Sequence, residues 1–273
     1  MPSYAIIGGS RGIGLEFVRQ LALSGDNTVF VTVRNKQKCT HLQDTINKLP
    51  HKNVHVLEAD VVDKQAIKNA AAEVSRITGG SLDVLIYNAA RLEFENILRG
   101  LLDYDSEEQL DEEFMQSLKV NVLGPIHTVN TFLPLLRKGA VKKIIIIGSE
   151  GGERDFVRRV HLSETAAYGI TKAAENMVAT KYAAELESEG FTVVSVSPGL
   201  VDVSSTYSEL EPPPEGSVPK FKVIAKKFYD AFPKTRSLTP QEAVERLLVY
   251  IESIGPADSG SFKPSLEFDT STQ

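Results

Sequence analysis

The chain alternates short apolar runs with longer stretches in which apolar residues recur at helical spacing. The apolar runs are rich in β-branched residues and are typical of buried parallel strands. The predicted strands cover residues 4–7, 28–33, 53–57, 82–86, 143–147 and 192–196. The predicted helices cover about 13–24, 36–48, 63–77, 107–137 and 166–189. This alternation predicts an α/β fold, a doubly wound parallel sheet with helices on both faces, formed as a single domain by residues 1–273.

Two segments interrupt the pattern. The helix predicted at 107–137 contains Pro125 and Pro134, so it must kink or break. Residues 203–237 form a long connection with three consecutive prolines and several aromatic residues. Long insertions in compact domains often serve as active-site lids, so we expect this segment to cover the substrate side. A further helix is predicted at 240–254, and the tail after it can add a last strand.

Composition narrows the function classes. Hydrophobic residues make up 42% and charged residues 24% of the chain, the balance of a globular protein, and the net charge of −6 argues against a nucleic-acid partner. With Cys39 as the single cysteine and no HExxH motif, no disulfide and no metal site are expected. No apolar run reaches the roughly 18 residues of a membrane span. The N-terminus becomes glycine-rich too early for a signal peptide, so we expect a cytoplasmic protein without a membrane partner.

A glycine-rich sequence, GGSRGIG at residues 8–14, follows the first strand and opens the first helix. Glycines at this point let the backbone turn tightly and approach a pyrophosphate at the helix N-terminus. The same residues satisfy GxSxG, the nucleophile elbow of hydrolases, but that elbow normally follows several strands. The position on the first strand therefore favours a dinucleotide site, with a plain glycine-rich turn as the simpler alternative.

The end of the second strand bears on the choice of cofactor. Folds that prefer NAD place an acidic residue there, against the ribose hydroxyls. This chain instead has Arg34, and Arg11 stands in the glycine-rich loop. Two guanidinium groups near one ribose suit a 2′-phosphate, so the sequence predicts NADP(H) as cofactor. Two solvated surface arginines are the alternative.

Three further residues carry candidate chemistry. Tyr168 and Lys172 are four residues apart and share one face of a predicted helix. A nearby positive charge lowers the pKa of a phenol towards neutrality, where it can exchange a proton with a carbonyl oxygen. Ser149 follows the strand at 143–147, at the sheet edge where ligands bind in α/β folds. It can hold a substrate oxygen, or it can simply be a turn serine.

Together with several shorter motifs, these residues resemble the short-chain dehydrogenase/reductase family over nearly the whole chain. Gly8, Gly12 and Gly14 match its TGxxxGxG turn, and Asp60-Val61 matches the pair that contacts the adenine. Asn88-Ala89-Ala90 is similar to its Asn-Ala-Gly motif, and Pro198-Gly199 matches the turn beside the nicotinamide. The resemblance implies a Rossmann fold and a cofactor site formed by Gly8, Ser10, Arg11, Gly12, Ile13, Gly14, Arg34, Asp60, Val61, Asn88, Ala89, Ala90, Tyr168, Lys172, Pro198, Gly199, Val201 and Val203.

The resemblance also implies a catalytic tetrad of Asn121, Ser149, Tyr168 and Lys172. In the family, the tyrosine is the acid/base and the serine orients the carbonyl. The lysine holds the nicotinamide ribose and lowers the tyrosine pKa, and the asparagine positions a water that feeds a proton relay. We expect the matching residues of this chain to do the same.

Several positions depart from the family pattern. The separation between Ser149 and Tyr168 is longer than usual and includes a charged run at 150–159, so Ser163 is a second candidate for the serine role. The family's usual threonine, glycine and threonine are replaced by Ile7, Ala90 and Val203. The first two changes indicate altered packing rather than lost chemistry.

The function that the resemblance implies is NADPH-dependent reduction of a small carbonyl substrate, and the motifs are nearest to the C-factor and sniffer-like carbonyl reductases. The alternatives are a catalytically silent NADP-binding sensor or scaffold, and an alcohol dehydrogenase that works in the oxidative direction. In this family the helices corresponding to 107–137 and 166–189 pair across a two-fold axis. We therefore expect a homodimer or homotetramer.

Overall fold

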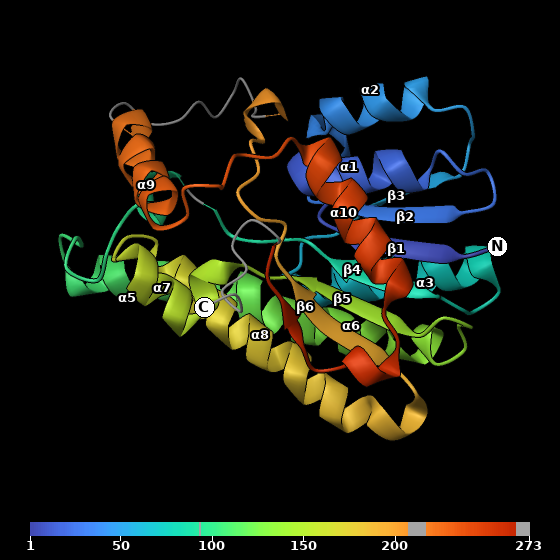
Figure 1. Ribbon diagram of the computed structural model, residues 1–273. Coiled ribbons are helices and arrows are strands. Elements are labelled where there is room, and N and C mark those ends of the chain that lie inside the picture. Colours follow the sequence, from blue (N-terminus) through green and yellow to red (C-terminus); the bar gives the residue numbers. More distant parts are fainter. Residues whose placement is uncertain (93, 207–216, 266–273) are drawn as a thin grey trace.

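The computed structural model describes residues 1–92, 94–206 and 217–265. In this part of the chain, seven parallel strands form one sheet in the order β3-β2-β1-β4-β5-β6-β7 (Figure 1). The strands are β1 (Ser3–Ile7), β2 (Thr28–Val33), β3 (Val54–Glu58), β4 (Val84–Tyr87), β5 (Lys143–Ile147), β6 (Thr192–Val196) and β7 (Phe262–Lys263). The order reverses between β1 and β4, which is the switch point of a Rossmann sheet. The predicted single-domain, doubly wound α/β fold is confirmed.

Helices cover both faces of the sheet (Figure 1). One face packs against α1 (Gly12–Leu21), α2 (Thr40–Lys48) and α10 (Pro240–Ser253), and the other against α3 (Lys64–Thr78), α6 (Gly124–Leu136) and α8 (Ala166–Leu186). Successive strand residues alternate between the two hydrophobic clusters: Ile144 and Ile146 of β5 belong to one, Ile145 and Ile147 to the other. Burial on both faces explains why the strands appear in the sequence as continuous apolar runs.

The predicted interruption of the helix at 107–137 is confirmed. It divides into α5 (Glu107–Leu118) and α6, which are joined by a π-helix at Lys119–Leu123. Pro125 lies in the first turn of α6, directly after the π-helix, while Pro134 lies inside α6. The buried Tyr87 hydroxyl donates to the Val120 carbonyl oxygen at 2.7 Å and so fixes the π-helix against β4.

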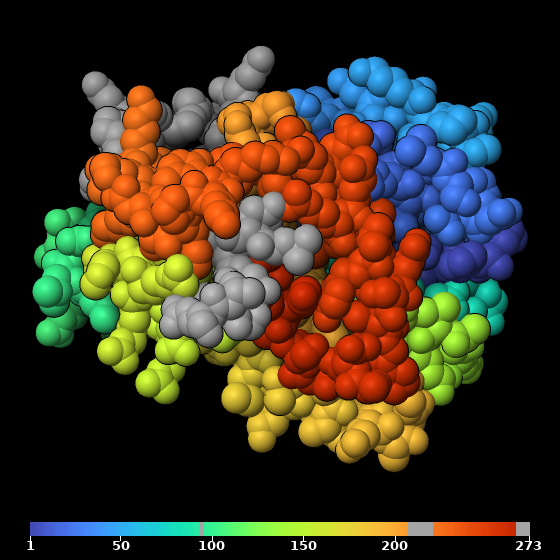
Figure 2. Space-filling model, viewed as in Figure 1, coloured from blue at the N-terminus to red at the C-terminus, as the bar shows by residue number. Residues whose placement is uncertain are grey.

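The sequence pattern did not predict three further helices. They are α4 (Phe94–Ile97), α7 (Arg154–Val160) within the charged insertion, and α9 (Ser217–Ala231) within the predicted lid. The space-filling view shows α9, in orange, on the surface beside the yellow-green residues of α7 (Figure 2). The remaining short 3₁₀-helices are Lys36–Lys38, Glu150–Gly152, Glu187–Glu189, Ser204–Thr206 and Pro256–Asp258. None of the described helices is both long and apolar enough to cross a membrane.

Candidate active site

The predicted site residues meet at the carboxyl edge of the sheet. Because the strands are parallel, the loops that follow them all open at this edge. Gly8 follows β1, Asn88 follows β4, and Ser149 lies two residues after β5. Other predicted cofactor-binding residues on these loops, all partly exposed, are Ser10, Arg11, Ile13, Asp60, Ala89, Ala90, Pro198, Gly199, Val201 and Val203.

The glycine-rich loop is held by two side chains from neighbouring strands. Asn88 Nδ2 donates to the Gly8 carbonyl oxygen at 2.6 Å, and the Gly8 N–H donates to Thr32 Oγ1 at 3.0 Å. A Cβ on Gly14 would lie 2.1 Å from the Gly8 oxygen, so only glycine fits there. Ile7, where the family usually has threonine, is fully buried, and Thr32 supplies a polar contact to the turn. The sequence analysis did not single out Thr32.

The start of α1 fits a phosphate group. Arg11 at the N-cap makes no capping hydrogen bond through its side chain, and the first turn contains no acidic residue. Backbone amides at such a helix start are suited to an anion. The Gly12 N–H donates to Thr206 Oγ1 at 2.9 Å, and a Cβ on Gly12 would lie 3.3 Å from Val203 Cγ1. The beginning of the predicted lid therefore rests directly on the glycine-rich loop.

The residues predicted to bind the adenine end of the cofactor lie at the ends of β2 and β3. Arg34 is exposed immediately after β2. Glu58 ends β3, where it is paired in register with the last residue of β2, and its carboxylate accepts from the Lys36 N–H at 3.0 Å. Asp60 is partly exposed and Val61 is buried, an arrangement that leaves the Asp60 side chain at the sheet edge.

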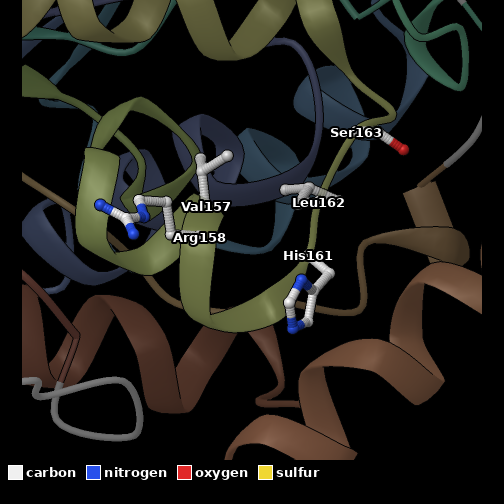
Figure 3. A pocket seen from close by; sticks show the side chains of 5 residues that line it. All are labelled: Val157, Arg158, His161, Leu162 and Ser163. Carbon is white, nitrogen blue, oxygen red and sulfur yellow. The ribbon is translucent and has the colours of Figure 1, made fainter.

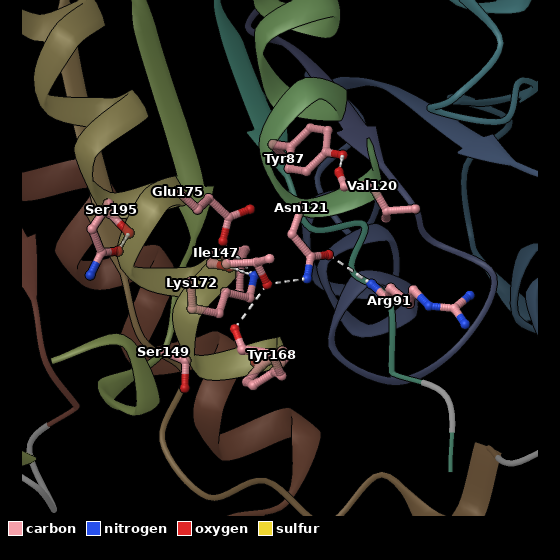
Figure 4. A network of polar contacts seen from close by, with 12 residues as sticks. Tyr87, Arg91, Val120, Asn121, Ile147, Ser149, Tyr168, Lys172, Glu175 and Ser195 are labelled. Atoms are coloured by element: carbon pink, nitrogen blue, oxygen red, sulfur yellow. Dashed lines mark hydrogen bonds and ion pairs between the residues drawn. The ribbon is translucent and has the colours of Figure 1, made fainter. Parts of the chain in front are cut away.

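Tyr168 and Lys172 project from the first turns of α8 towards the end of β5 (Figure 4). Lys172 Nζ lies 5.6 Å from the centroid of the Tyr168 ring. The ammonium donates to the Ile147 carbonyl oxygen at 2.7 Å and to Glu175 Oε2 at 2.5 Å. The structure thus brings the predicted phenol and ammonium together, and it adds a carboxylate that the sequence analysis did not select.

The electrostatics of Tyr168 differ from the sequence-based expectation of a net lowering. Burial raises the pKa of its phenol, and this is the largest influence. The charge of Lys172 lowers that pKa, as predicted, and so does a hydrogen bond with Ser149, while the charge of Glu175 raises it. The net pKa lies above the ordinary value, because desolvation penalises the phenolate and Glu175 opposes Lys172.

Ser149 reaches Tyr168 because two backbone segments come unusually close. A Cβ on Gly152 would lie 2.6 Å from the Ala173 nitrogen, so glycine allows the 3₁₀-helix Glu150–Gly152 to lie against α8. Ser149 also accepts from the Gly151 N–H at 3.1 Å. It is therefore a capping serine as well as a neighbour of the phenol, and its role towards a substrate oxygen stays a prediction.

Ser163, the second candidate for the serine role, lies away from Tyr168 and Lys172. It is exposed and lines an open depression of about 480 Å³ together with Val157, Arg158, His161 and Leu162 (Figure 3). None of the four predicted catalytic residues lines this depression. The geometry therefore favours Ser149. In the described part of the chain, no cluster of histidine, cysteine or acidic side chains has the arrangement of a metal site.

Asn121 lies fully buried in the π-helix and connects α8 to the loop that follows β4. Its Nδ2 donates to Thr171 Oγ1 at 2.9 Å, and its Oδ1 accepts from the Arg91 N–H at 2.8 Å (Figure 4). The Arg91 guanidinium is in turn paired with buried Glu113 at 2.9 Å. Thr171 was not predicted, although its place between Tyr168 and Lys172 on one helix is a signal in the sequence.

Comparisons with known proteins agree with this geometry. Residues 4–213 match the family model described as short chain dehydrogenase. The short-chain dehydrogenase/reductase atnB of Arthrinium sp is 43% identical over 79% of this chain and 80% of its own. The short-chain dehydrogenase/reductase AacuF of Aspergillus aculeatus is 40% identical over 93% of this chain and 92% of its own.

Solved structures give the same fold. A carbonyl reductase from chicken fatty liver, described as NADPH bound, superposes with a TM-score of 0.74 at 26% identity, covering 97% of this chain and 96% of its own. The carbonyl reductase Sniffer of D. melanogaster superposes with a TM-score of 0.75 at 22% identity, with the same coverage of 97% and 96%. From the family match, the close relatives and the ordered motifs around the sheet edge, we conclude that this chain belongs to the short-chain dehydrogenase/reductase family.

Proposed function

We propose that this oxidoreductase is an NADPH-dependent carbonyl reductase that converts a small ketone or aldehyde to an alcohol. The observation that carries the proposal is the convergence of Asn121, Ser149, Tyr168 and Lys172 at the carboxyl edge of the sheet, beside the glycine-rich loop. A catalytically silent NADP-binding sensor would need the glycine-rich loop but would not need these four catalytic residues. The NADPH described in the chicken carbonyl reductase and the arginine in place of an acidic residue after β2 support NADP over NAD.

The chemistry divides between cofactor and protein. When bound, a reduced nicotinamide would supply the hydride for the carbonyl carbon. The Tyr168 hydroxyl donates its proton to the carbonyl oxygen, and Ser149 donates a hydrogen bond that orients the same oxygen. Lys172 would hold the nicotinamide ribose. Asn121 fixes the π-helix against α8 through Thr171, and so holds the tetrad together.

The electrostatics of Tyr168 are compatible with its proposed role as proton donor. A proton donor has to be protonated when the substrate binds, and the raised pKa keeps the Tyr168 phenol protonated through neutral pH. Alcohol oxidation requires the phenolate instead, which forms only above that raised pKa. The protonated phenol is therefore the form that carbonyl reduction requires at neutral pH.

Consumption of NADPH with a panel of ketones and aldehydes tests this function directly. We expect turnover with at least one carbonyl class and slower turnover with the matching alcohols and NADP⁺ at neutral pH. Binding of NADPH without turnover of any substrate would instead identify a sensor or scaffold.

The segment 203–237 is proposed to act as a lid, and residues 207–216 of that segment lie outside the described residues. Its α9 packs on α7 through Phe156, whose ring centroid lies 5.6 Å from that of Phe228 on α9. The Phe156 ring also stacks on Phe232, which directly follows α9. Lys227 Nζ, also on α9, pairs with Glu164 at 2.7 Å, close to the start of α8. The lid thus bridges the insertion and the helix that carries Tyr168.

We expect amide hydrogen exchange in 217–237 to slow when NADPH and a substrate analogue bind, because closure buries this segment. Exchange should be measured with cofactor alone and with both ligands. The amides of β5, which lies between β4 and β6 inside the sheet, provide the internal control. Equal exchange rates in 217–237 with and without ligands would refute the lid.

Assembly is proposed to use α5 and α8. Large apolar side chains lie exposed along these helices and the π-helix, namely Met115, Leu123, Ile170 and Met177. We expect sedimentation velocity at micromolar concentration to show a dimer or tetramer, and Met177→Glu to shift it towards monomer by placing charge in the contact. Val249→Glu on α10, which is likewise exposed, is the matched control. A monomeric wild type would contradict the proposal.

A further inference from the structure

A fully buried ion pair lies beside the predicted tetrad. Lys172 and Glu175 are three residues apart on α8, and their side chains are 2% and 0% exposed. The contact from Lys172 Nζ to Glu175 Oε2 is 2.5 Å (Figure 4). Removing two charges from water is costly, and truncating one partner leaves the other charge buried without compensation. The lysine therefore depends on this carboxylate for its charge.

The surroundings of Lys172 offer few other compensating groups. Its second acceptor is the neutral Ile147 carbonyl oxygen at 2.7 Å. The phenol of Tyr168 lies on the same helix, and that of Tyr87 on β4; the charge of Glu175 raises the pKa of both. The other buried carboxylates on elements packed against α8 have partners of their own: Glu150 bonds to Ser197 and Ser265, and Glu113 bonds to Arg91, Asn96 and Ser117.

We propose that Glu175 is a positioning residue that keeps Lys172 protonated and fixed beside Tyr168, and that it thereby sets the upper pH limit of the reaction. The proposal rests on the proposed function only for its kinetic consequence. The ion pair itself belongs to the cofactor-free protein and can be tested there.

The direction of the effect follows from the charges. Burial lowers the pKa of Lys172, but the attraction and hydrogen bond of Glu175 outweigh it and leave that pKa raised. Burial raises the pKa of Glu175 to about 7, so the carboxylate is ionised on the alkaline side of neutrality. Without it, Lys172 loses its proton at lower pH, and Tyr168 also loses a charge that keeps it protonated. Both changes move the upper pH limit of reduction downwards.

Glu175→Gln is the decisive change, because it removes the charge while preserving the size of the side chain and one hydrogen-bond acceptor. In ¹⁵N NMR of the cofactor-free protein, with the signal assigned by its absence in Lys172→Arg, we expect the Lys172 Nζ to titrate at least about one pH unit lower than in wild type. The alkaline limit of kcat/KM for carbonyl reduction should move in the same direction. Glu175→Asp keeps the charge with a longer contact and should give a smaller shift.

Glu113→Gln is the matched control, since it too removes the carboxylate of a buried ion pair but leaves Lys172 untouched. It should lower activity without changing the pKa of Lys172 or the alkaline limit of kcat/KM. If Glu175→Gln loses activity equally at every pH, and the pKa of Lys172 and the alkaline limit of kcat/KM stay unchanged, then Glu175 has only a structural role and the proposal is overturned. If no carbonyl is turned over, the NMR titration still decides the role of Glu175, and only the proposed function fails.

Discussion

Replacement of Tyr168 by Phe is expected to remove nearly all turnover and to leave NADPH affinity close to that of wild type. The change deletes the proton donor at the substrate oxygen and keeps the ring that packs beside Lys172. The measurements are kcat with the best carbonyl substrate and the Kd of NADPH. A variant that keeps more than about a tenth of wild-type activity has lost less than about 1.4 kcal/mol of barrier lowering, and the acid/base assignment would then be wrong.

Tyr182→Phe is the control on the same helix. Its hydroxyl donates to the Ile126 carbonyl oxygen at 3.0 Å and lies 2.8 Å from Asn130 Oδ1, so the variant also loses a partly buried hydroxyl, but one away from the tetrad. We expect it to lower stability and to keep most of the activity. Equal losses in the two variants would point to damaged packing of α8 rather than to a lost proton donor.

The second large effect concerns the choice of cofactor. Each charged hydrogen bond to a phosphate contributes about 1.5–3 kcal/mol, so the loss of one arginine should weaken NADPH by roughly 10- to 150-fold and leave NADH nearly unaffected. Arg34→Asp should go further, because a carboxylate repels the 2′-phosphate and accepts from free ribose hydroxyls. The measurement is kcat/KM with both cofactors for wild type and variant.

Lys38→Asp is the control, because it makes the same change of charge at an exposed position four residues after Arg34. It should leave the preference for NADPH over NADH unchanged. Glu58, at the end of the neighbouring strand, places a negative charge near the same corner. If the wild type prefers NADH, then Glu58 rather than Arg34 determines the cofactor preference. An unchanged preference in Arg34→Asp would identify Arg34 as a surface charge.

The sheet and its loop ends could be predicted from the sequence because their signals are local. Strands buried on both faces give continuous apolar runs, and the glycines at 8–14 are required by contacts with the adjacent turn and helix. The predicted interruption near Pro125 was also right, since proline restricts the backbone at its own position. Its form as a π-helix depends on the contact between Tyr87 and Val120, which is distant in sequence.

The features that the sequence analysis did not predict arise from contacts between segments that are distant in the sequence. Alone, α7 is one polar helical segment of seven residues, and its Phe156 becomes buried only when α9 packs against it. Glu175 was missed for a related reason. A glutamate on a helix is ordinarily solvated, and nothing in the sequence shows that this face of α8 turns inward with Lys172. The net pKa of Tyr168 could not be predicted without knowing its burial.

The hydrophobic cluster between α7 and α9 is separate from the two clusters that line the sheet. Its buried members are Leu98, Phe156, Val160, Leu162, Ile224 and Phe232. Contacts of this kind form a cooperative unit that can open locally while the rest of a protein stays folded. This cluster can therefore vary in sequence with little loss of global stability. If it covers the substrate as proposed, selectivity for different carbonyl compounds can diverge among related chains while the cofactor half of the fold stays the same.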